Sequence, residues 1–253
     1  MEPGGEVLIT GGTGFVGPHL RQELARRGWE PVVFPSSRTD LTDRRETAER
    51  FAAHQEARAL VHLAAWQAAG TFPAEHPAEQ LAKNSLIHVN VLEAWRAFLP
   101  GAKLIAVGSS CAYPDGTPPF REEDYLAGSI HGSVHAYAQT RRLLHTGVES
   151  YNDQYGLDGT FLIPATMYGE GDDFCQETAH VCGALVARFV RARREGRERV
   201  TVWGDGGQVR DFMDVKEFAR VVAELLPRCR REVLNVSPGW GTTIGDLART
   251  IAA

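Results

Sequence analysis

The chain has 253 residues, of which 43% are hydrophobic and 23% are charged, and its formal net charge is -5 at pH 7. This composition is typical of a globular protein in water and gives no sign of a nucleic-acid-binding surface. At about 150 residues per domain, the length allows one large domain or two small ones.

Cysteine spacing and hydropathy indicate the cellular compartment and the kinds of partner to expect. Cys111, Cys175, Cys182 and Cys229 form neither a CxxC pair nor a zinc-ligand spacing, so we expect no metal and a reducing, cytoplasmic compartment. No signal peptide precedes the first strand, and no apolar run approaches the ~20 residues that a membrane span needs. We therefore expect neither a membrane nor a nucleic acid among the partners.

A glycine-rich turn follows the first predicted strand, 7–9, and opens a helix predicted over 18–27. Gly11, Gly14 and Gly17 have the spacing that suits a tight turn, a close backbone approach to a pyrophosphate, and packing of the helix on the strand. The strand before and the helix after favour dinucleotide binding over a simple glycine-rich turn. The predicted cofactor contacts here are Gly11, Thr13, Gly14, Phe15, Val16 and Gly17.

The segment after the second predicted strand, 31–34, indicates which dinucleotide binds. An NAD site usually has a carboxylate at this point to bind the ribose 2′-hydroxyl. Here Ser36, Ser37 and Arg38 follow the strand instead, and hydroxyls with an Arg suit a 2′-phosphate. We therefore predict NADP(H), with Ser37 and Arg38 as contacts and with Asp40 and Leu41 beside the adenine.

The third predicted strand, 59–63, ends in small residues that let a cofactor lie close to the backbone. Leu63, Ala64 and Ala65 are therefore predicted cofactor contacts. A loop is expected over 66–77 and a long helix over 78–98. Asn84 and Asn90 lie inside that helix, where Asn is usually neutral or unfavourable, so we expect one of them to contact the backbone or the site.

The fourth predicted strand, 104–107, stops at Gly108 and exposes Ser109, Ser110 and Cys111. In an open parallel sheet, ligands bind at strand ends of this kind. A hydroxyl here can share the oxygen of a bound carbonyl or carbinol. We therefore expect the reacting part of a substrate at this strand end.

Tyr137 and Arg141 lie one turn apart at the start of a helix predicted over 136–155. A phenol is a poor proton donor or acceptor at neutral pH unless a nearby charge lowers its pKa. A cation four residues along a helix lies on the same face and can have this effect. The pair is therefore predicted to hold an oxygen and move a proton.

Strands alternate with helices along the chain, which predicts a doubly wound parallel sheet with right-handed crossovers. We expect a dinucleotide-binding domain over 1–163 and a mixed substrate-binding part over 164–253, from which the chain returns to the first domain. Pro164, at the end of a strand over 160–163, is a predicted cofactor contact. The remaining predictions are loops over 115–133 and 171–179, helices over 181–194 and 215–226, strands over 200–203 and 233–236, and a last helix capped by Thr242 or Thr243.

These patterns resemble the extended short-chain dehydrogenase/reductase superfamily over nearly the whole chain, and within it they are similar to the GDP-L-fucose synthase family. The carriers of the resemblance are the segments 10–17, 62–65, 108–114, 137–141, 151–156, 168–174, 179–181, 202–204 and 210–212. The resemblance implies epimerisation of GDP-4-keto-6-deoxymannose at C3 and C5, followed by NADPH-dependent reduction at C4. It also implies a homodimer that forms through the helices over 78–98 and 136–155.

The same resemblance implies roles for single residues. Ser109 and Tyr137 would hold the C4 oxygen, with Tyr137 as the acid and Arg141 beside it. Cys111 and His180 would be the acid/base pair of epimerisation, because the C3 and C5 protons flank a ketone and both side chains titrate near neutral pH. The implied substrate contacts are Ser110, Arg188, Trp203 and Arg210, the last three on the GDP side.

The chain departs from the family pattern at two points. The family has Lys where this chain has Arg141, and that Lys hydrogen-bonds the nicotinamide ribose, so the resemblance also implies that Tyr137 and Arg141 contact the cofactor. Arg supplies the charge but is bulkier and does not pass on a proton. Family members also continue for several tens of residues beyond the point that matches Ala253. Two alternatives stay open: a GDP-sugar epimerase without net redox change, and a cofactor-binding protein with impaired catalysis.

Overall fold

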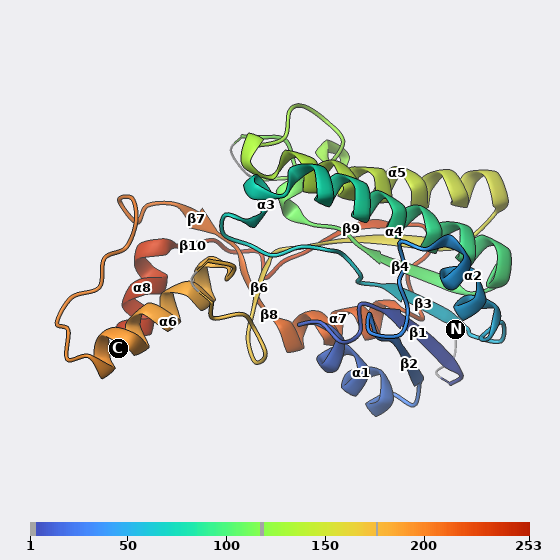
Figure 1. Ribbon diagram of the computed structural model, residues 1–253, viewed down its shortest axis with the longest axis horizontal. Helices are drawn as coiled ribbons and strands as arrows, with labels where there is room; N and C mark the ends of the chain where they lie inside the picture. The colour runs from blue at the N-terminus through green and yellow to red at the C-terminus, as the bar shows by residue number, and fades with distance from the viewer. Residues whose placement is uncertain (1–3, 117–118, 176) are drawn as a thin grey trace.

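The computed structural model of the protein describes residues 4–116, 119–175 and 177–253. At its centre is a six-stranded parallel sheet in the order β2-β1-β3-β4-β5-β9 (Figure 1). The predicted doubly wound parallel sheet is therefore confirmed. The six strands are β1 (Glu6–Thr10), β2 (Glu30–Phe34), β3 (Ala59–His62), β4 (Lys103–Val107), β5 (Gly159–Pro164) and β9 (Val233–Val236).

The strand order reverses next to β1. This strand pairs with β2 on one side and with β3 on the other, both in parallel. In sheets of this kind, the chain leaves the carboxyl ends of the two strands in opposite directions and opens a crevice between them. The glycine-rich turn after β1 and the small residues after β3 both lie at this point.

Helices cover both faces of the sheet (Figure 1). Because successive strand residues point to opposite faces, both sets of side chains are buried, which explains the continuous apolar strands of the sequence. Leu8, Leu60 and Leu104 belong to the core on one face, and Ile9 and Val61 belong to the core on the other. The covering helices are α2 (Arg44–Ala52), α4 (Pro77–Phe98) and α5 (His135–Tyr155) on the first face, and α1 (Gly17–Arg26) and α7 (Val215–Leu225) on the second.

A smaller lobe projects from the sheet, on the left in Figure 1. It contains α6 (Val181–Arg194), α8 (Ile244–Ala252) and an antiparallel pair of short strands, β7 (Val209–Arg210) and β10 (Thr242–Thr243). A second short pair, β6 (Thr166–Tyr168) and β8 (Phe212–Asp214), runs parallel. After β8 the chain returns to the large sheet through α7 and β9.

Two local predictions were wrong. The expected loop over 66–77 contains a short helix, α3 (Phe72–Glu75), with Pro73 in its first turn. The expected strand over 200–203 is not a strand, because Val200 and Val202 line a pocket against α6 and α8 instead of pairing with a sheet. Residues 117, 118 and 176, inside two predicted loops, lie outside the described residues.

Both asparagines inside α4 make backbone contacts, where such a contact was predicted for one of them. The side-chain amide of Asn84 donates to the Trp66 carbonyl, and its oxygen accepts from the Trp66 N–H. Asn90 donates to the carbonyls of Leu41 and Thr42. The helix thereby fixes the chain after β3 and the chain after β2. Within the described residues, no helix is long and apolar enough to cross a membrane.

Candidate active site

The glycine-rich turn is packed so closely that side chains are excluded at two of its positions. Gly11 has a φ of 70°, and a Cβ there would lie 2.7 Å from the backbone nitrogen of Ala64. A Cβ on Gly17 would lie 2.2 Å from the carbonyl oxygen of Gly12. Beside Gly14, by contrast, the nearest atom to a Cβ would be 3.4 Å away. The turn thus packs closely against the end of β3 and the start of α1. Beside Gly14 it leaves the space that a pyrophosphate needs to approach the backbone.

The residues after β2 fit a phosphorylated ribose. Ser37 and Arg38 are exposed at the end of the strand. The first carboxylate beyond them, on Asp40, accepts hydrogen bonds from the N–H and the hydroxyl of Thr42, at 2.9 and 2.7 Å. These bonds lower the pKa of Asp40 and direct its carboxylate to Thr42. The segment between β2 and Asp40 contains no carboxylate, and within the described residues the Arg38 side chain makes no hydrogen bond or ion pair.

A buried polar chain lies where β1 and β3 end. Thr10 Oγ1 lies 2.7 Å from His62 Nδ1, and His62 Nε2 lies 2.8 Å from His88 Nδ1 on α4. All three side chains are fully buried. Burial lowers the pKa of both histidines, that of His62 to about 3, and the charge of Arg141 acts in the same direction. The pair is therefore neutral at physiological pH, which the sequence did not reveal.

Tyr137 and Arg141 are in direct contact on α5. The Arg141 Nε and Nη2 groups both donate to the Tyr137 hydroxyl oxygen, at 2.9 and 2.8 Å, and Nη1 donates to the Val107 carbonyl at 2.9 Å. One guanidinium thus joins the phenol to the end of β4. Because two N–H groups occupy the phenol oxygen, the hydroxyl proton of Tyr137 is left to be donated elsewhere.

Burial changes the acidity expected for this phenol. It raises the pKa of Tyr137, while the charge of Arg141 acts to lower it, and burial is the larger effect. The expectation of a lowered pKa was therefore wrong in its net direction, although Arg141 acts as predicted. The cause is packing under the sheet edge, since Tyr137 is 7% exposed. The phenol keeps its proton at neutral pH, which suits a proton donor.

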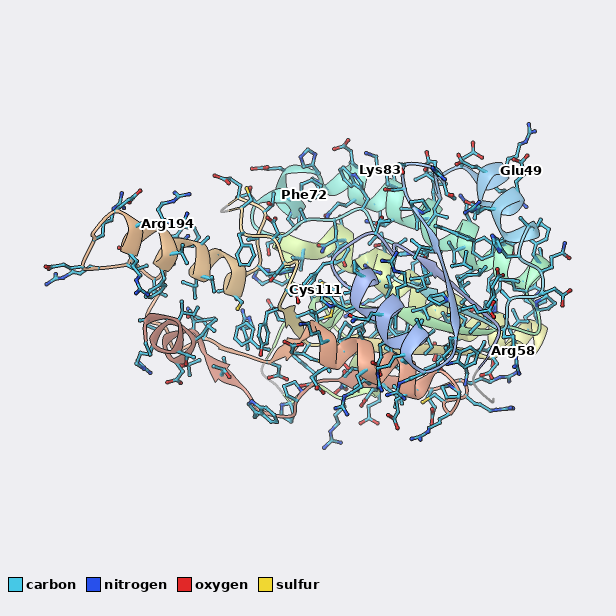
Figure 2. All side chains as sticks on the ribbon, turned by 90° about the horizontal axis from the view of Figure 1, so that it is seen from below. Glu49, Arg58, Phe72, Lys83, Cys111 and Arg194 are labelled. Carbon is cyan, nitrogen blue, oxygen red and sulfur yellow. The ribbon has the colours of Figure 1, made fainter. Side chains whose placement is uncertain are left out.

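Ser109 and Cys111 lie together beyond β4. The Ser109 hydroxyl donates to Cys111 Sγ at 3.1 Å and accepts from the Cys111 backbone N–H at 3.4 Å. Burial raises the pKa of the Cys111 thiol, and the Ser109 hydrogen bond and the charge of Arg141 oppose it. Ser109 also acts to lower the pKa of Tyr137, so the structure brings Ser109, Cys111, Tyr137 and Arg141 into one cluster. In Figure 2, Cys111 lies in the middle of the molecule, where the lobe meets the sheet.

His180 lies in the lobe, and among the described residues no hydrogen bond or ion pair joins it to Cys111 or Tyr137. It precedes α6, and its ring is exposed yet crowded by protein atoms, so desolvation lowers its pKa while Asp172 and Asp173 act to raise it. The preceding segment is joined to the chain after β3, because the Ala69 N–H donates to the Thr178 carbonyl at 2.9 Å. The imidazole is thus neutral near pH 7 and is able to accept a proton.

The other predicted substrate contacts lie in the lobe and beside Cys111. The Arg188 guanidinium lies over the Trp203 ring, 4.2 Å from its centroid, and Trp203 is 75% exposed. Arg210, on β7, donates to the carbonyl of Val209 and is exposed. Ser110 begins the short 3-10 helix Ser110–Ala112 at the end of β4. The structure therefore pairs Arg188 with Trp203 and places Arg210 on a separate strand.

Comparisons with known proteins identify the family of the chain. The model of the NAD dependent epimerase/dehydratase family matches residues 7–237. The chain belongs to this family. It is 33% identical to a probable GDP-L-fucose synthase 1 of Oryza sativa, over 99% of the chain and 77% of that protein. It is 32% identical to the GDP-L-fucose synthase of Escherichia coli, over 97% of the chain and 80% of that protein.

A solved structure gives the same result. A GDP-L-fucose synthetase from Naegleria fowleri bound to NADP superposes with a TM-score of 0.84 at 28% identity, and covers 97% of this chain and 76% of that one. The likeness to this family extends through the sheet and the lobe. The epimerase/dehydratase fold thus accounts for both parts of the chain.

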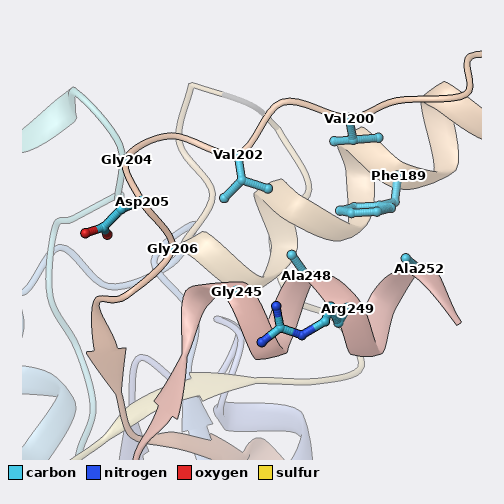
Figure 3. Close-up of a pocket in the computed structure, with 10 residues that line it drawn as sticks. All are labelled: Phe189, Val200, Val202, Gly204, Asp205, Gly206, Gly245, Ala248, Arg249 and Ala252. Carbon is cyan, nitrogen blue, oxygen red and sulfur yellow. The ribbon is translucent and has the colours of Figure 1, made fainter.

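This member of the epimerase/dehydratase family also has a pocket of about 340 Å³ in the lobe, lined by Phe189, which follows Arg188, and by Val202 and Gly204, which flank Trp203. Figure 3 shows it between α6, α8 and the segment over 200–206. Phe189, Val200, Val202 and Ala248 give it an apolar lining. Ser109, Cys111 and Tyr137 do not line it, so it is separate from the chemistry.

Sequence reasoning missed four contributors to the site. His88 and Tyr125 are buried, and Arg142 binds a row of loop carbonyls. A Cβ on Gly70 would lie 1.9 Å from the Glu177 carbonyl oxygen, so this glycine admits the segment before His180. Only His88 could have been noticed in the sequence, as a histidine inside an apolar helix. The roles of Tyr125, Arg142 and Gly70 depend on contacts between distant segments.

Proposed function

We propose that the protein is an NADP(H)-dependent nucleotide-sugar epimerase/reductase that acts on a GDP-4-keto-6-deoxyhexose. The observation that carries this proposal is the cluster at the end of β4, where Arg141 binds the Tyr137 oxygen through two N–H groups next to Ser109 and Cys111. The names of the relatives in rice and Escherichia coli support the substrate class.

The reduction needs a hydride at C4 and a proton on the C4 oxygen. NADPH supplies the hydride when it is bound. The residues that would hold the cofactor are those of the glycine-rich turn, the exposed Ser37 and Arg38, and the backbone of Leu63 to Ala65, together with Asp40, Leu41 and Pro164. Tyr137 donates the proton, because its oxygen already accepts from Arg141 and its raised pKa keeps it protonated. Ser109 holds the same substrate oxygen through its hydroxyl.

The epimerisation needs a base on one face of the sugar ring and an acid on the other. His180 has a lowered pKa and is neutral, so it can accept a proton from carbon. Cys111 has a raised pKa and is a thiol, so it can donate one. At C3 and at C5, removal of a proton gives an enolate that the C4 oxygen carries, and proton return on the opposite face inverts the centre.

The lobe provides the nucleotide contacts in this proposal. Trp203 offers an exposed ring for stacking of a base, and Arg188, which lies over that ring, and Arg210 offer cations to the diphosphate. Ser110 contacts the sugar. Residues 1–163 form the dinucleotide-binding domain, and 164–253 form the substrate part whose chain returns to the large sheet.

We also propose a cytoplasmic homodimer that forms through α4 and α5. Five large apolar side chains are exposed on these two helices, and burial of such a surface is what stabilises a symmetric dimer. The four cysteines are free, as is usual in a reducing compartment. A Leu86→Glu variant should shift the mass measured by light scattering from dimer to monomer. The five side chains are Leu81, Leu86, Val89, Leu143 and Tyr155.

One experiment tests the activity. The protein is incubated with GDP-4-keto-6-deoxymannose and NADPH in D2O, and deuterium at C3 and C5 is followed by NMR alongside NADPH absorbance. Deuterium uptake with NADPH loss is the expected result. Deuterium uptake alone would indicate an epimerase without net redox change, and neither signal would indicate a cofactor-binding protein without this catalysis.

A further inference from the structure

Ser109 lies just beyond the part of β4 that the sheet holds. The last backbone hydrogen bond between β4 and β5 runs from the Gly108 N–H to the Leu162 carbonyl at 2.7 Å. Beyond Gly108, no further backbone hydrogen bond joins the described part of this segment to β5, although Ser109 must aim its hydroxyl at the reacting oxygen. Some other contact has to fix its backbone.

Tyr125 makes that contact. Its hydroxyl donates to the Ser109 carbonyl at 3.1 Å and accepts from the Ser109 N–H at 3.4 Å. One oxygen thus holds the peptide groups on both sides of the same residue, at a φ of -157° and a ψ of 137°. Because these two dihedrals set the direction of the Cα–Cβ bond, they also set where the Ser109 hydroxyl points.

The ring of Tyr125 is locked in place. It is 1% exposed and packs against Tyr113, His145 and Phe161, with centroid distances of 5.1 to 5.4 Å. A Cβ on Gly108 would lie 3.1 Å from the Tyr125 hydroxyl, so the strand end is shaped around this oxygen. A buried phenol with both of its partners on one residue is therefore a specific contact with Ser109.

The loop that carries Tyr125 is anchored to the helix that carries the acid. Arg142, the residue after Arg141, donates to the carbonyls of Ala112, Ala127 and Gly128 at 2.7 to 3.0 Å. Asn235 on β9 holds the other side of the loop, because its N–H donates to Glu122 and its amide donates to the Phe120 carbonyl. The long loop before α5 thus ties α5 to the segment of Ser109 and Cys111.

We propose that Tyr125 is a positioning residue for Ser109 and Cys111, and that Arg142 anchors the loop over 119–133 as a brace for them. This inference rests on the proposed function, since it assigns Ser109 a place on the substrate oxygen. Arg142 and Tyr137 lie on the same helix, α5. The brace therefore keeps the position of Ser109 fixed relative to Tyr137.

A pair of buried tyrosines makes the test specific. Tyr125→Phe removes only the hydroxyl on Ser109. Tyr113→Phe is the matched control, because Tyr113 belongs to the same aromatic cluster but its hydroxyl donates to Asn235 Oδ1 at 2.7 Å, whereas Asn235 holds the loop through its backbone N–H and its Nδ2. We expect Tyr125→Phe to lower kcat for C4 reduction roughly 10- to 100-fold, with KM and NADPH affinity within about twofold of the parent. Tyr113→Phe should keep kcat.

A second readout does not depend on activity. The Cys111 thiol accepts from Ser109, so its alkylation rate, followed by peptide mass mapping across pH, reports the geometry of this turn. Tyr125→Phe and Arg142→Lys should change the rate profile at Cys111, and Tyr113→Phe should not. If Tyr125→Phe and Tyr113→Phe have the same kcat and the same alkylation profile at Cys111, the proposed brace is wrong as an account of Ser109. If the parent shows no reduction, the proposed function fails while the alkylation comparison still tests the brace.

Discussion

The two sides of the candidate site differ in how firmly they are built. On the sheet side, Tyr137 and Arg141 are 7% and 5% exposed and are joined by two hydrogen bonds. On the lobe side, Trp203 is 75% exposed. Buried polar groups need fixed partners, whereas exposed aromatic rings are free to stack on a ligand.

The difference separates chemistry from recognition. Proton transfer requires fixed distances, which the sheet, α5 and their hydrogen bonds supply. Nucleotide binding tolerates side chains that adopt a fixed conformation only when the ligand is bound. We therefore expect substitutions on the sheet side to lower kcat, and substitutions at Arg188, Trp203 or Arg210 to raise KM.

The largest effect is expected from Tyr137→Phe. Loss of the proton donor should slow hydride transfer by roughly 10²–10⁴-fold, with NADPH affinity retained. Single-turnover NADPH oxidation measures the rate, and Tyr155→Phe, on the exposed face of the same helix, is the control. A fully active Tyr137→Phe protein would show that another group protonates the C4 oxygen.

Cys111→Ser and His180→Asn compare the two sides directly. Each should slow deuterium exchange at C3 and C5 by roughly 10²-fold, because each removes one member of the acid/base pair. NADPH oxidation with a ketone that needs no epimerisation should persist in both variants. Unchanged exchange in both would leave Cys111 and His180 as structural residues.

Low pH should reduce the free energy of unfolding through His62 and His88, which lie on the sheet side. Burial lowers the pKa of both histidines, that of His62 to about 3, so the folded protein keeps them neutral while the unfolded chain takes up protons near pH 6.5. Their contribution to stability is therefore complete above pH 6.5 and is lost as pH falls below it, by about 2 kcal/mol for each histidine at pH 5.

Urea unfolding at pH 7 and pH 5 measures this loss. His88→Gln should reduce it, and His135→Gln, at an exposed position at the start of α5, should not. The same pH dependence in the parent and in His88→Gln would mean that other groups take up the protons.

Arg38→Ala tests the exposed end of the cofactor site. The preference for NADPH over NADH should fall by about 1–3 kcal/mol, the value of one charged hydrogen bond. Arg45→Ala removes another exposed arginine, which pairs with Glu49 on α2, and should leave the preference unchanged. Equal affinity of the parent for both cofactors, measured by fluorescence titration, would remove the role assigned to Arg38.

The smallest effect is expected from Gly70→Ala, at the contact between the chain after β3 and the segment before His180. Gly70→Ala should displace the Glu177 carbonyl and slow exchange at C3 and C5 by roughly fivefold, equivalent to about 1 kcal/mol. Gly156→Ala is matched in backbone strain, with a φ of 68° against 64°, but has no atom within 4 Å. On urea unfolding, Gly70→Ala should lose more stability than Gly156→Ala, because it adds the contact with the Glu177 carbonyl to the same backbone strain. Similar exchange rates in the two would mean that Gly70 does not position His180.

Local interactions explain what the sequence determined. The apolar strands and the glycine-rich turn were predicted because their patterns arise from the pleat and from the backbone of a few adjacent residues. The cap of the last helix was predicted for the same reason, since the Thr243 hydroxyl accepts from the N–H of Asp246. The carriers of the family resemblance, such as 108–114 and 137–141, are likewise short segments.

Tertiary structure decided whatever depends on contacts between distant segments. His62 and His88 are 26 residues apart, and Tyr125 lies 16 residues from the Ser109 that it holds. The apolar stretch with Val200 and Val202 has the pattern of a strand, yet it packs against two helices. The pKa of Tyr137 shows the reason most directly: the charge of Arg141 is set by the sequence, but the larger effect, burial, exists only once the chain is packed.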